Sequence, residues 1–112
     1  IMDTKTQLFS SRAAEKASAA LYILATGDGD LKKRLLRAWR ELGTLSDRSL
    51  PADFQEPYDQ MHESVTSHDG ESYDEGSIAA SIRHMSAEEA DHLARQMVAF
   101  AVDVAIATAE GR

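Results

Sequence analysis

Apolar residues recur along this chain at intervals of three and four, which is the period of an α-helix. Strand-like alternation of apolar and polar residues never runs for more than a few positions. The pattern predicts helices over about 9–26, 31–42, 51–66, 77–83 and 87–109. It therefore favours an all-α fold: a compact bundle of four main helices plus one short helix, forming a single helical domain over residues 1–112.

Residues that typically begin and end helices set these boundaries. Gly27 is expected to end the first helix in a left-handed conformation, which glycine adopts at little cost. Asp28 or Asp30 then caps the second helix. Ser86 followed by Glu89 has the spacing of a capping box, the clearest local signal in the chain.

The boundaries of the third and fourth helices depend on proline, serine and glycine. Pro51 suits a first helical turn, whereas Pro57 is expected to kink the third helix or delay its start. Residues 67–76 form a polar, acidic segment with two glycines, which predicts a mobile loop. Ser77 is expected to cap the short fourth helix.

The last helix is unusually apolar. One stripe has spacings of four, three, four and three, and consists of Leu93, Met97, Phe100, Val104 and Ala107. Further apolar residues widen it: Val98, Ala101, Val102, Ala105 and Ile106. A helix that is apolar over most of its circumference is buried on several sides. It is either the central helix of the bundle or a subunit interface, and the second alternative predicts a homodimer through this C-terminal helix.

Charge is segregated along the chain. The net charge is −7, and no Lys or Arg occurs between Arg48 and Arg83. That segment carries eight acids, namely Asp53, Glu56, Asp59, Glu63, Asp69, Glu71, Asp74 and Glu75. A surface of this kind attracts positively charged partners, and the overall acidity argues against binding nucleic acid through its phosphate backbone.

The acidic segment leads to the main functional hypothesis, a non-enzymatic interaction or regulatory protein that binds a protein partner with a basic surface. The predicted contact residues are Asp59, Glu63, Glu71, Tyr73, Asp74 and Glu75. Tyr73 is either an anchor at the interface or folded back onto the bundle. A more specific form is an inhibitor that covers a basic surface of its target, with carboxylates in place of phosphates. The alternative is an acidic face that is merely solvated.

Basic residues crowd the second helix and support an alternative function. A helical nucleic-acid-binding protein would use Lys32, Lys33, Arg34, Arg37 and Arg40. The competing interpretation, which we prefer, is that these residues pair with the acids of the third helix inside the molecule.

Four histidines offer a third alternative, a small metal-binding protein or enzyme. The candidate ligands are His62, Glu63, His68, His84 and His92. However, His62 and His68 are six residues apart, and a zinc-protease helix needs a spacing of four for both to reach one metal. Solvated surface histidines therefore remain the simpler interpretation, and no metal site or cofactor is assigned.

Composition and motifs exclude several further classes of function. Cysteine is absent, which excludes disulfides, thiolate metal sites and a cysteine nucleophile. The sequence contains no nucleophile elbow, phosphate-binding loop or dinucleotide-binding glycine motif, so we do not expect an enzyme. Residues 1–8 lack a signal-peptide pattern, and 97–109 is too short to span a membrane. These features predict a cytoplasmic protein.

Overall fold

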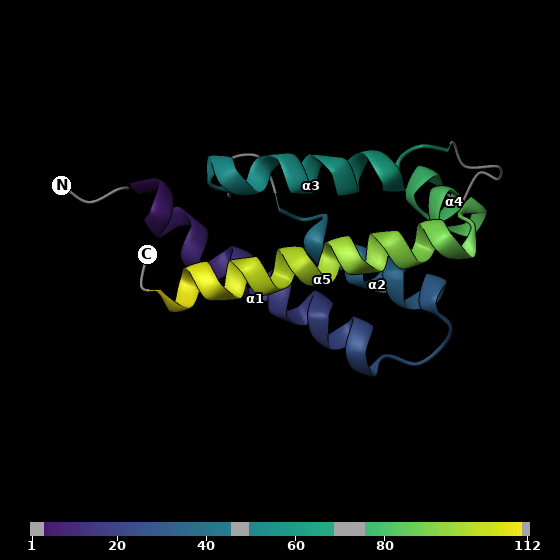
Figure 1. The fold of residues 1–112 in the computed structure, drawn as a ribbon, viewed down its shortest axis with the longest axis horizontal. Coiled ribbons are helices and arrows are strands. Elements are labelled where there is room, and N and C mark those ends of the chain that lie inside the picture. Colours follow the sequence, from purple (N-terminus) through teal and green to yellow (C-terminus); the bar gives the residue numbers. More distant parts are fainter. Residues whose placement is uncertain (1–3, 46–49, 69–75, 111–112) are drawn as a thin grey trace.

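A computed structural model of the chain describes residues 4–45, 50–68 and 76–110, with side chains from Arg12 onward. These residues form five helices and no strand, which confirms the all-α prediction within the described part of the chain (Figure 1). The helices are α1 (Thr4–Thr26), α2 (Leu31–Leu42), α3 (Ala52–Val65), α4 (Gly76–His84) and α5 (Ala87–Ala109). No helix among the described residues is long and apolar enough to cross a membrane.

Helix α5 lies at the centre of the arrangement. It packs along α1 and also contacts α2 and α3 (Figure 1). The α1 and α5 helices run in opposite directions, while the short α4 lies at one end of the bundle beside α2 and α3. The contacts of α5 with α1, α2 and α3 support the alternative in which the C-terminal helix is the central one.

Small residues on α1 let it approach the large side chains of α5. Ala13, Ala17 and Ala20 are at most 2% exposed, and so are Leu93 and Met97 on α5. Burial of a leucine or methionine side chain stabilises the fold by about 1.5–3 kcal/mol. The small-to-large match brings the two helix axes close together without leaving voids.

Aromatic rings join α2, α3 and α5. Trp39 stacks on Tyr58 with ring centroids 5.6 Å apart, and Tyr58 lies 6.0 Å from Phe100. Phe54 meets Phe100 edge to face at 6.0 Å. Trp39, Tyr58 and Phe100 are buried as predicted, whereas Phe54 is only half-buried.

Two predicted helix caps are confirmed. The side chain of Asp30 accepts a hydrogen bond from the Lys33 backbone N–H at 3.0 Å at the start of α2. At the start of α5, Ser86 Oγ accepts from the Glu89 N–H at 3.0 Å, and Glu89 Oε1 accepts from the Ser86 N–H at 2.8 Å. These reciprocal bonds satisfy two backbone donors that would otherwise lack partners.

Three boundary predictions are wrong. Gly27 does not adopt positive φ; among the described glycines, Gly29 (φ 95°) and Gly76 (φ 72°) do so. Gly27 is instead required by a close approach, because a Cβ there would lie 2.5 Å from the Ile23 carbonyl oxygen. In addition, α1 begins at Thr4, five residues earlier than the predicted start at about residue 9, and α4 begins at Gly76.

The prolines and Ser77 also behave differently from expectation. Pro51 is the N-cap of α3 with extended backbone, not part of its first turn. The helix starts at Ala52 and continues through Pro57, so Pro57 does not delay its start. Pro57 cannot donate a backbone hydrogen bond, and its ring crowds the carbonyl four residues earlier, so a proline at this position costs stability. Ser77 lies inside the first turn of α4 and does not cap it.

Candidate functional site

The exposed face of α3 carries a row of carboxylates. Glu56, Asp59 and Glu63 are spaced three and four residues apart, on the side opposite the buried Tyr58 and Met61. The row spans about 10 Å, because a helix rises about 1.5 Å per residue. All three carboxylates are exposed, and Asp59 accepts a hydrogen bond from Gln55 Nε2 at 2.9 Å. Two predicted contact residues, Asp59 and Glu63, therefore lie on one accessible surface.

The other predicted contact residues, Glu71, Tyr73, Asp74 and Glu75, lie outside the described residues. The expected mobile loop at 67–76 falls largely in the same undescribed stretch.

The basic residues of α2 bind backbone carbonyls at the carboxyl ends of neighbouring helices. Arg34 donates to the Leu24 carbonyl at 2.7 Å, near the end of α1, a helix that has no basic residue in its own last turn. Lys32 donates to the Arg83 carbonyl at 2.9 Å, at the end of α4. Positive charge at these ends stabilises the helices by offsetting the negative pole of the helix dipole.

One of the three remaining basic residues of α2 also binds a backbone carbonyl. Arg37 donates to the Asp28 carbonyl at 3.2 Å, in the turn that follows α1. Lys33 and Arg40 are exposed. Three of the five residues proposed for nucleic-acid binding therefore bind carbonyls at helix ends and in a turn. Fewer cations of α2 are then available to bind a phosphate backbone.

The pairing expected between the acids of α3 and the bases of α2 is not found among the described residues. The ion pairs described there are Lys16 with Glu41 at 3.4 Å and Arg95 with Asp91 at 2.8 Å. Neither involves α3. The charge segregation of the sequence thus persists among the described residues: three of the α2 cations bind carbonyl oxygens, and the α3 carboxylates face solvent.

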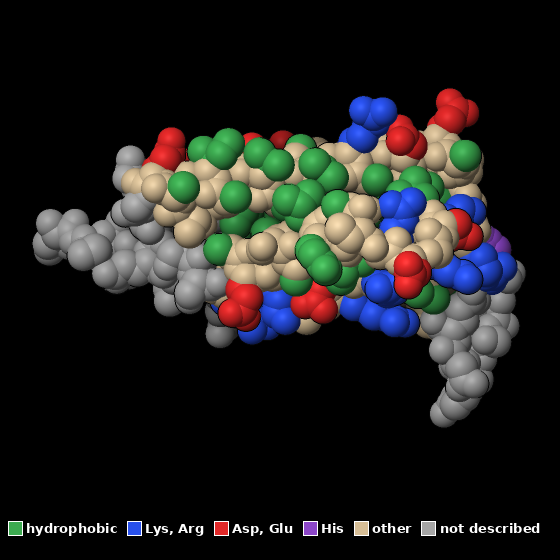
Figure 2. Space-filling model, turned by 90° about the horizontal axis from the view of Figure 1, so that it is seen from below, with side chains coloured by type: hydrophobic (Ala, Val, Ile, Leu, Met, Phe, Trp, Pro, Cys, Tyr) green, Lys and Arg blue, Asp and Glu red, His purple; other side chains and the backbone are tan. Residues whose placement is uncertain are grey.

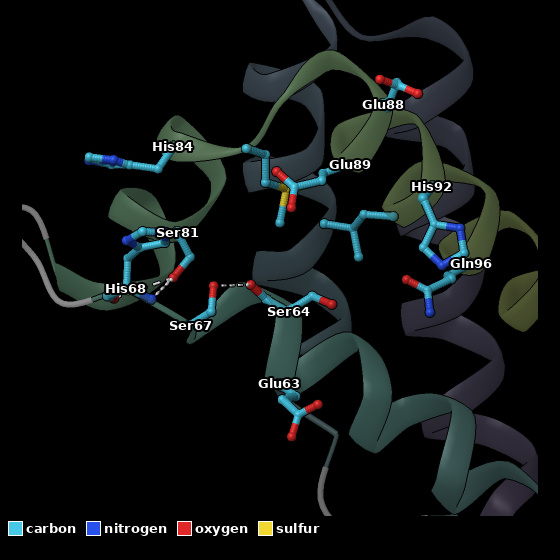
Figure 3. A pocket seen from close by; sticks show the side chains of 12 residues that line it. Glu63, Ser64, Ser67, His68, Ser81, His84, Glu88, Glu89, His92 and Gln96 are labelled. Carbon is cyan, nitrogen blue, oxygen red and sulfur yellow. Dashed lines mark hydrogen bonds between the residues drawn. The ribbon is translucent and has the colours of Figure 1, made fainter.

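A pocket of about 490 Å³ opens between α3, α4 and α5, at the carboxyl end of the acidic row (Figure 3). Its charged and polar lining combines three glutamates and three histidines with serines and one glutamine. Its lining residues are Glu63, Ser64, Ser67, His68, Ser81, His84, Met85, Glu88, Glu89, His92, Leu93 and Gln96. No lysine or arginine lines it. The volume falls in the range of small-ligand sites.

Ser81 ties the wall of this pocket together. It is 1% exposed, accepts a hydrogen bond from the His68 N–H at 2.8 Å and donates to the His68 carbonyl at 3.3 Å (Figure 3). These bonds fix the chain after α3 against α4. They also place the His68 ring on that of His84, with centroids 4.7 Å apart and planes at 14°.

The serines of the pocket are engaged with backbone. Ser64 donates to the Gln60 carbonyl at 3.2 Å, and Ser67 donates to the Ser64 carbonyl at 3.1 Å. Together with Ser81, each serine hydroxyl of the lining therefore has a backbone carbonyl as its acceptor. The arrangement favours a binding site with a rigid polar wall over one in which a histidine activates a serine.

Glu89 is held as a carboxylate by its cap. The backbone N–H of Ser86, and then its hydroxyl, lower the pKa of Glu89, and the positive potentials of His68 and Lys32 contribute less. Neither Glu63 nor Glu88 takes part in a capping box of this kind. They lie on opposite sides of the pocket, Glu63 on α3 and Glu88 on α5 (Figure 3).

Gln96 lies at the end of the pocket below His92, one helical turn along α5 (Figure 3). Its Oε1 is buried and has no hydrogen-bond partner. A buried acceptor without a donor costs about 1–3 kcal/mol. The same side chain also lines a second hollow, of about 370 Å³, formed with Asp53, Phe54 and Asp103 among others.

Three of the four histidines meet in this pocket, while the metal-binding alternative stays a prediction. His68, His84 and His92 line one pocket with Glu63, as the sequence could not show. His62 points elsewhere, with its ring 6.3 Å from that of Trp39. Among the described residues, no group of three or more His, Asp or Glu side chains is arranged to hold a metal ion.

An apolar stripe on the outside of α5 remains uncovered. Val98, Val102 and Ile106 are 38%, 41% and 52% exposed, and Tyr22 of α1 is 71% exposed. Figure 2 shows apolar side chains gathered on this side of the molecule. The residues that widen the apolar surface of α5 thus divide into two groups. Ala101 is buried against the bundle, whereas Val98, Val102 and Ile106 face solvent.

Comparisons with protein-family models, with curated proteins and with solved structures give no match to this chain.

Proposed function

We propose that this chain is a non-enzymatic interaction protein that binds a basic segment of a partner protein through the exposed carboxylates of α3. The observation that carries the proposal is the row formed by Glu56, Asp59 and Glu63, which has no lysine or arginine partner among the described residues. Unpaired surface charge of one sign attracts an oppositely charged surface and speeds its association.

A regulatory or inhibitory role follows naturally from this chemistry. Carboxylates spaced along a rigid helix can occupy arginine and lysine sites that normally bind phosphates. Covering such a surface would block its activity without any reaction on this chain. The undescribed residues Glu71, Tyr73, Asp74 and Glu75 would extend the contact in this proposal.

The test compares capture of partner proteins by the wild type and by two charge-reversed variants. The surface variant carries Glu56→Lys and Asp59→Lys, which add four units of positive charge on α3. The control carries Glu15→Lys and Glu110→Lys, the same charge change at exposed positions of α1 and the end of α5. Circular dichroism establishes that both variants keep their helices.

The proposal predicts a basic partner that is retained by the wild type and the control and lost by the surface variant. Raising the salt concentration should release it, because the screening length falls to about 8 Å near physiological ionic strength. Equal retention by both variants, or a partner without a basic surface, would overturn the proposal.

The outer stripe of α5 supports a second proposal, self-association of two copies. Residues 91, 95, 98, 102, 105 and 109 follow one another at spacings of four and three, the pattern of a helix-pairing seam. In an antiparallel pair, Val98 would face Val102 of the second copy, and the stem of Arg95 would cover Ala105. Arg95 is already paired with Asp91 at 2.8 Å, so the seam carries no unbalanced charge.

Light scattering on the wild type and on Val102→Glu tests this pairing. We expect the mass of two chains for the wild type and of one chain for the variant, because each glutamate would be buried against Val98 of the second copy, near the symmetry axis. Ala25→Glu, at an exposed position of α1, is the control and should stay dimeric. A wild type that remains monomeric at high concentration contradicts the proposal.

A further inference from the structure

We infer that the pocket between α3, α4 and α5 is a subsite for one arginine side chain of the basic segment. The inference rests on the proposed function, since it names the group that the acidic surface would select. It adds a specific site at one end of the carboxylate row and a specific chemical group, the guanidinium.

Charge is the first argument. Glu63 on α3 and Glu88 on α5 lie on opposite sides of the pocket, and the lining contains no cationic lysine or arginine (Figure 3). The nearest cations are already engaged: Lys32 donates to the Arg83 carbonyl at the end of α4. A guanidinium in the pocket would form charge-assisted hydrogen bonds with a carboxylate of the lining, and such bonds are about twice as strong as neutral ones.

The unsatisfied acceptor inside the pocket is the second argument. Gln96 Oε1 is buried and lacks a donor. A rotation of its terminal amide would turn this oxygen toward an occupant. Arginine presents five N–H donors in a planar fork, so it can reach a carboxylate and the amide oxygen at the same time. The observation is independent of the acidic row, because it concerns a neutral side chain of α5.

Shape and lining supply the third argument. Leu93 is 1% exposed and Met85 is half-buried, and both contribute apolar surface to the pocket. The three methylenes of an arginine stem can lie on such surface while the charged head stays among polar groups. A bare cation would gain nothing from this apolar surface, and the described residues show no group of ligands that would hold a metal.

The rigid wall favours a preorganised site. Ser81 fixes the backbone of His68, and the His68 and His84 rings stack at 4.7 Å. Glu89 is held in its capping box with Ser86 and does not need to move. A site whose walls are fixed before binding loses less entropy when it is occupied.

The experiment titrates short capped peptides into isotope-labelled protein at pH 7.5 and low salt, followed by amide chemical shifts. Each peptide has one central residue flanked by two glycines on each side. The central residue is arginine, lysine or citrulline, which has the shape of arginine without its charge. The protein variants are Glu63→Gln and Gln96→Met in the pocket, with Glu56→Gln as a control that removes the same charge from the same helix outside it.

We expect the arginine peptide to shift amides around Ser64, Ser81 and His92, the lysine peptide to shift them less and citrulline to leave them unchanged. Glu63→Gln should weaken binding about tenfold, the loss expected for one hydrogen bond to a charged group, and Glu56→Gln, in the acidic row but outside the pocket, should weaken it much less. Gln96→Met should weaken arginine binding and leave lysine binding nearly unchanged, because only the arginine fork reaches both groups.

Equal weakening by Glu63→Gln and Glu56→Gln would overturn the subsite, since it would mean that only diffuse charge matters. Shifts spread along α3, or none with arginine, would overturn it too. This failure is distinct from failure of the proposed function. If Glu56→Lys with Asp59→Lys abolishes partner capture while the pocket variants do not, the acidic surface stands and the arginine subsite falls.

Discussion

Tyr58 links α3 to the end of α2, and its hydroxyl offers a sharp test of the structure. The side chain is 4% exposed, and its hydroxyl lies 3.0 Å from the Leu42 carbonyl and 2.7 Å from the Leu45 carbonyl. Leu42 is the last residue of α2, where carbonyls lack intrahelical donors. Tyr58→Phe removes a donor that both oxygens share and leaves the ring packing intact, while the Leu42 carbonyl keeps the Leu45 N–H at 3.0 Å.

The expected loss is about 1–3 kcal/mol of unfolding free energy, because the Leu45 carbonyl at a buried site loses this donor, whereas the Leu42 carbonyl keeps another. For a chain of this size, that corresponds to a fall in Tm of roughly 4–12 °C. Urea denaturation followed by circular dichroism measures the change. The midpoint should fall while the slope m stays constant, since the surface exposed on unfolding is the same.

Tyr22→Phe is the matched control. Its side chain is 71% exposed, so removal of its hydroxyl should change the unfolding free energy by less than about 0.5 kcal/mol. Equal effects of the two substitutions, or no effect of Tyr58→Phe, would refute the conclusion that the Tyr58 hydroxyl links α3 to the end of α2.

Two further predictions concern helix ends. Because hydrogen bonds from Ser86 lower the pKa of Glu89 in the folded chain, the stability that Glu89 contributes is present at neutral pH. It is lost as the pH falls from the ordinary glutamate range, about 4.3, through the lowered value. Urea midpoints of wild type and Glu89→Gln should therefore differ at pH 7 and converge in acid, below the lowered pKa. Gly27→Ala should lower the free energy of unfolding by about 1–3 kcal/mol, since its Cβ would lie 2.5 Å from the Ile23 carbonyl oxygen. Thermal unfolding measures this loss. A Tm equal to that of the wild type would contradict the close approach.

Local sequence signals identified most of the helices and their best-defined boundaries. The 3.6-residue period located α2 and α5, and the caps at Asp30 and Ser86 fixed where they begin. Caps of this kind are readable because donor and acceptor are within three residues of each other. Gly27 was misread, since the group that demands glycine there is the Ile23 carbonyl, and only the folded turn brings it close.

The pocket, by contrast, could not be predicted from the sequence. The sequence singled out Glu63 and the histidines, but His68, His84 and His92 come from the end of α3, the end of α4 and the start of α5. Their meeting depends on how three helices pack, which no spacing along the chain encodes. Gln96 gave no sequence signal at all, because its distinguishing feature is a buried oxygen without a donor.

The sequence by itself determined the helical class and the segregation of charge, since each follows from local periodicity or composition. It left α5 either as the central helix or as a subunit interface, and the contacts of α5 with α1, α2 and α3 depend on tertiary packing. The tertiary structure also decided how part of the positive charge is used. Packing brings Lys32, Arg34 and Arg37 to carbonyls at the ends of other helices and of a turn, at 2.7–3.2 Å. These contacts join separate elements of the fold, and no spacing along the chain encodes them.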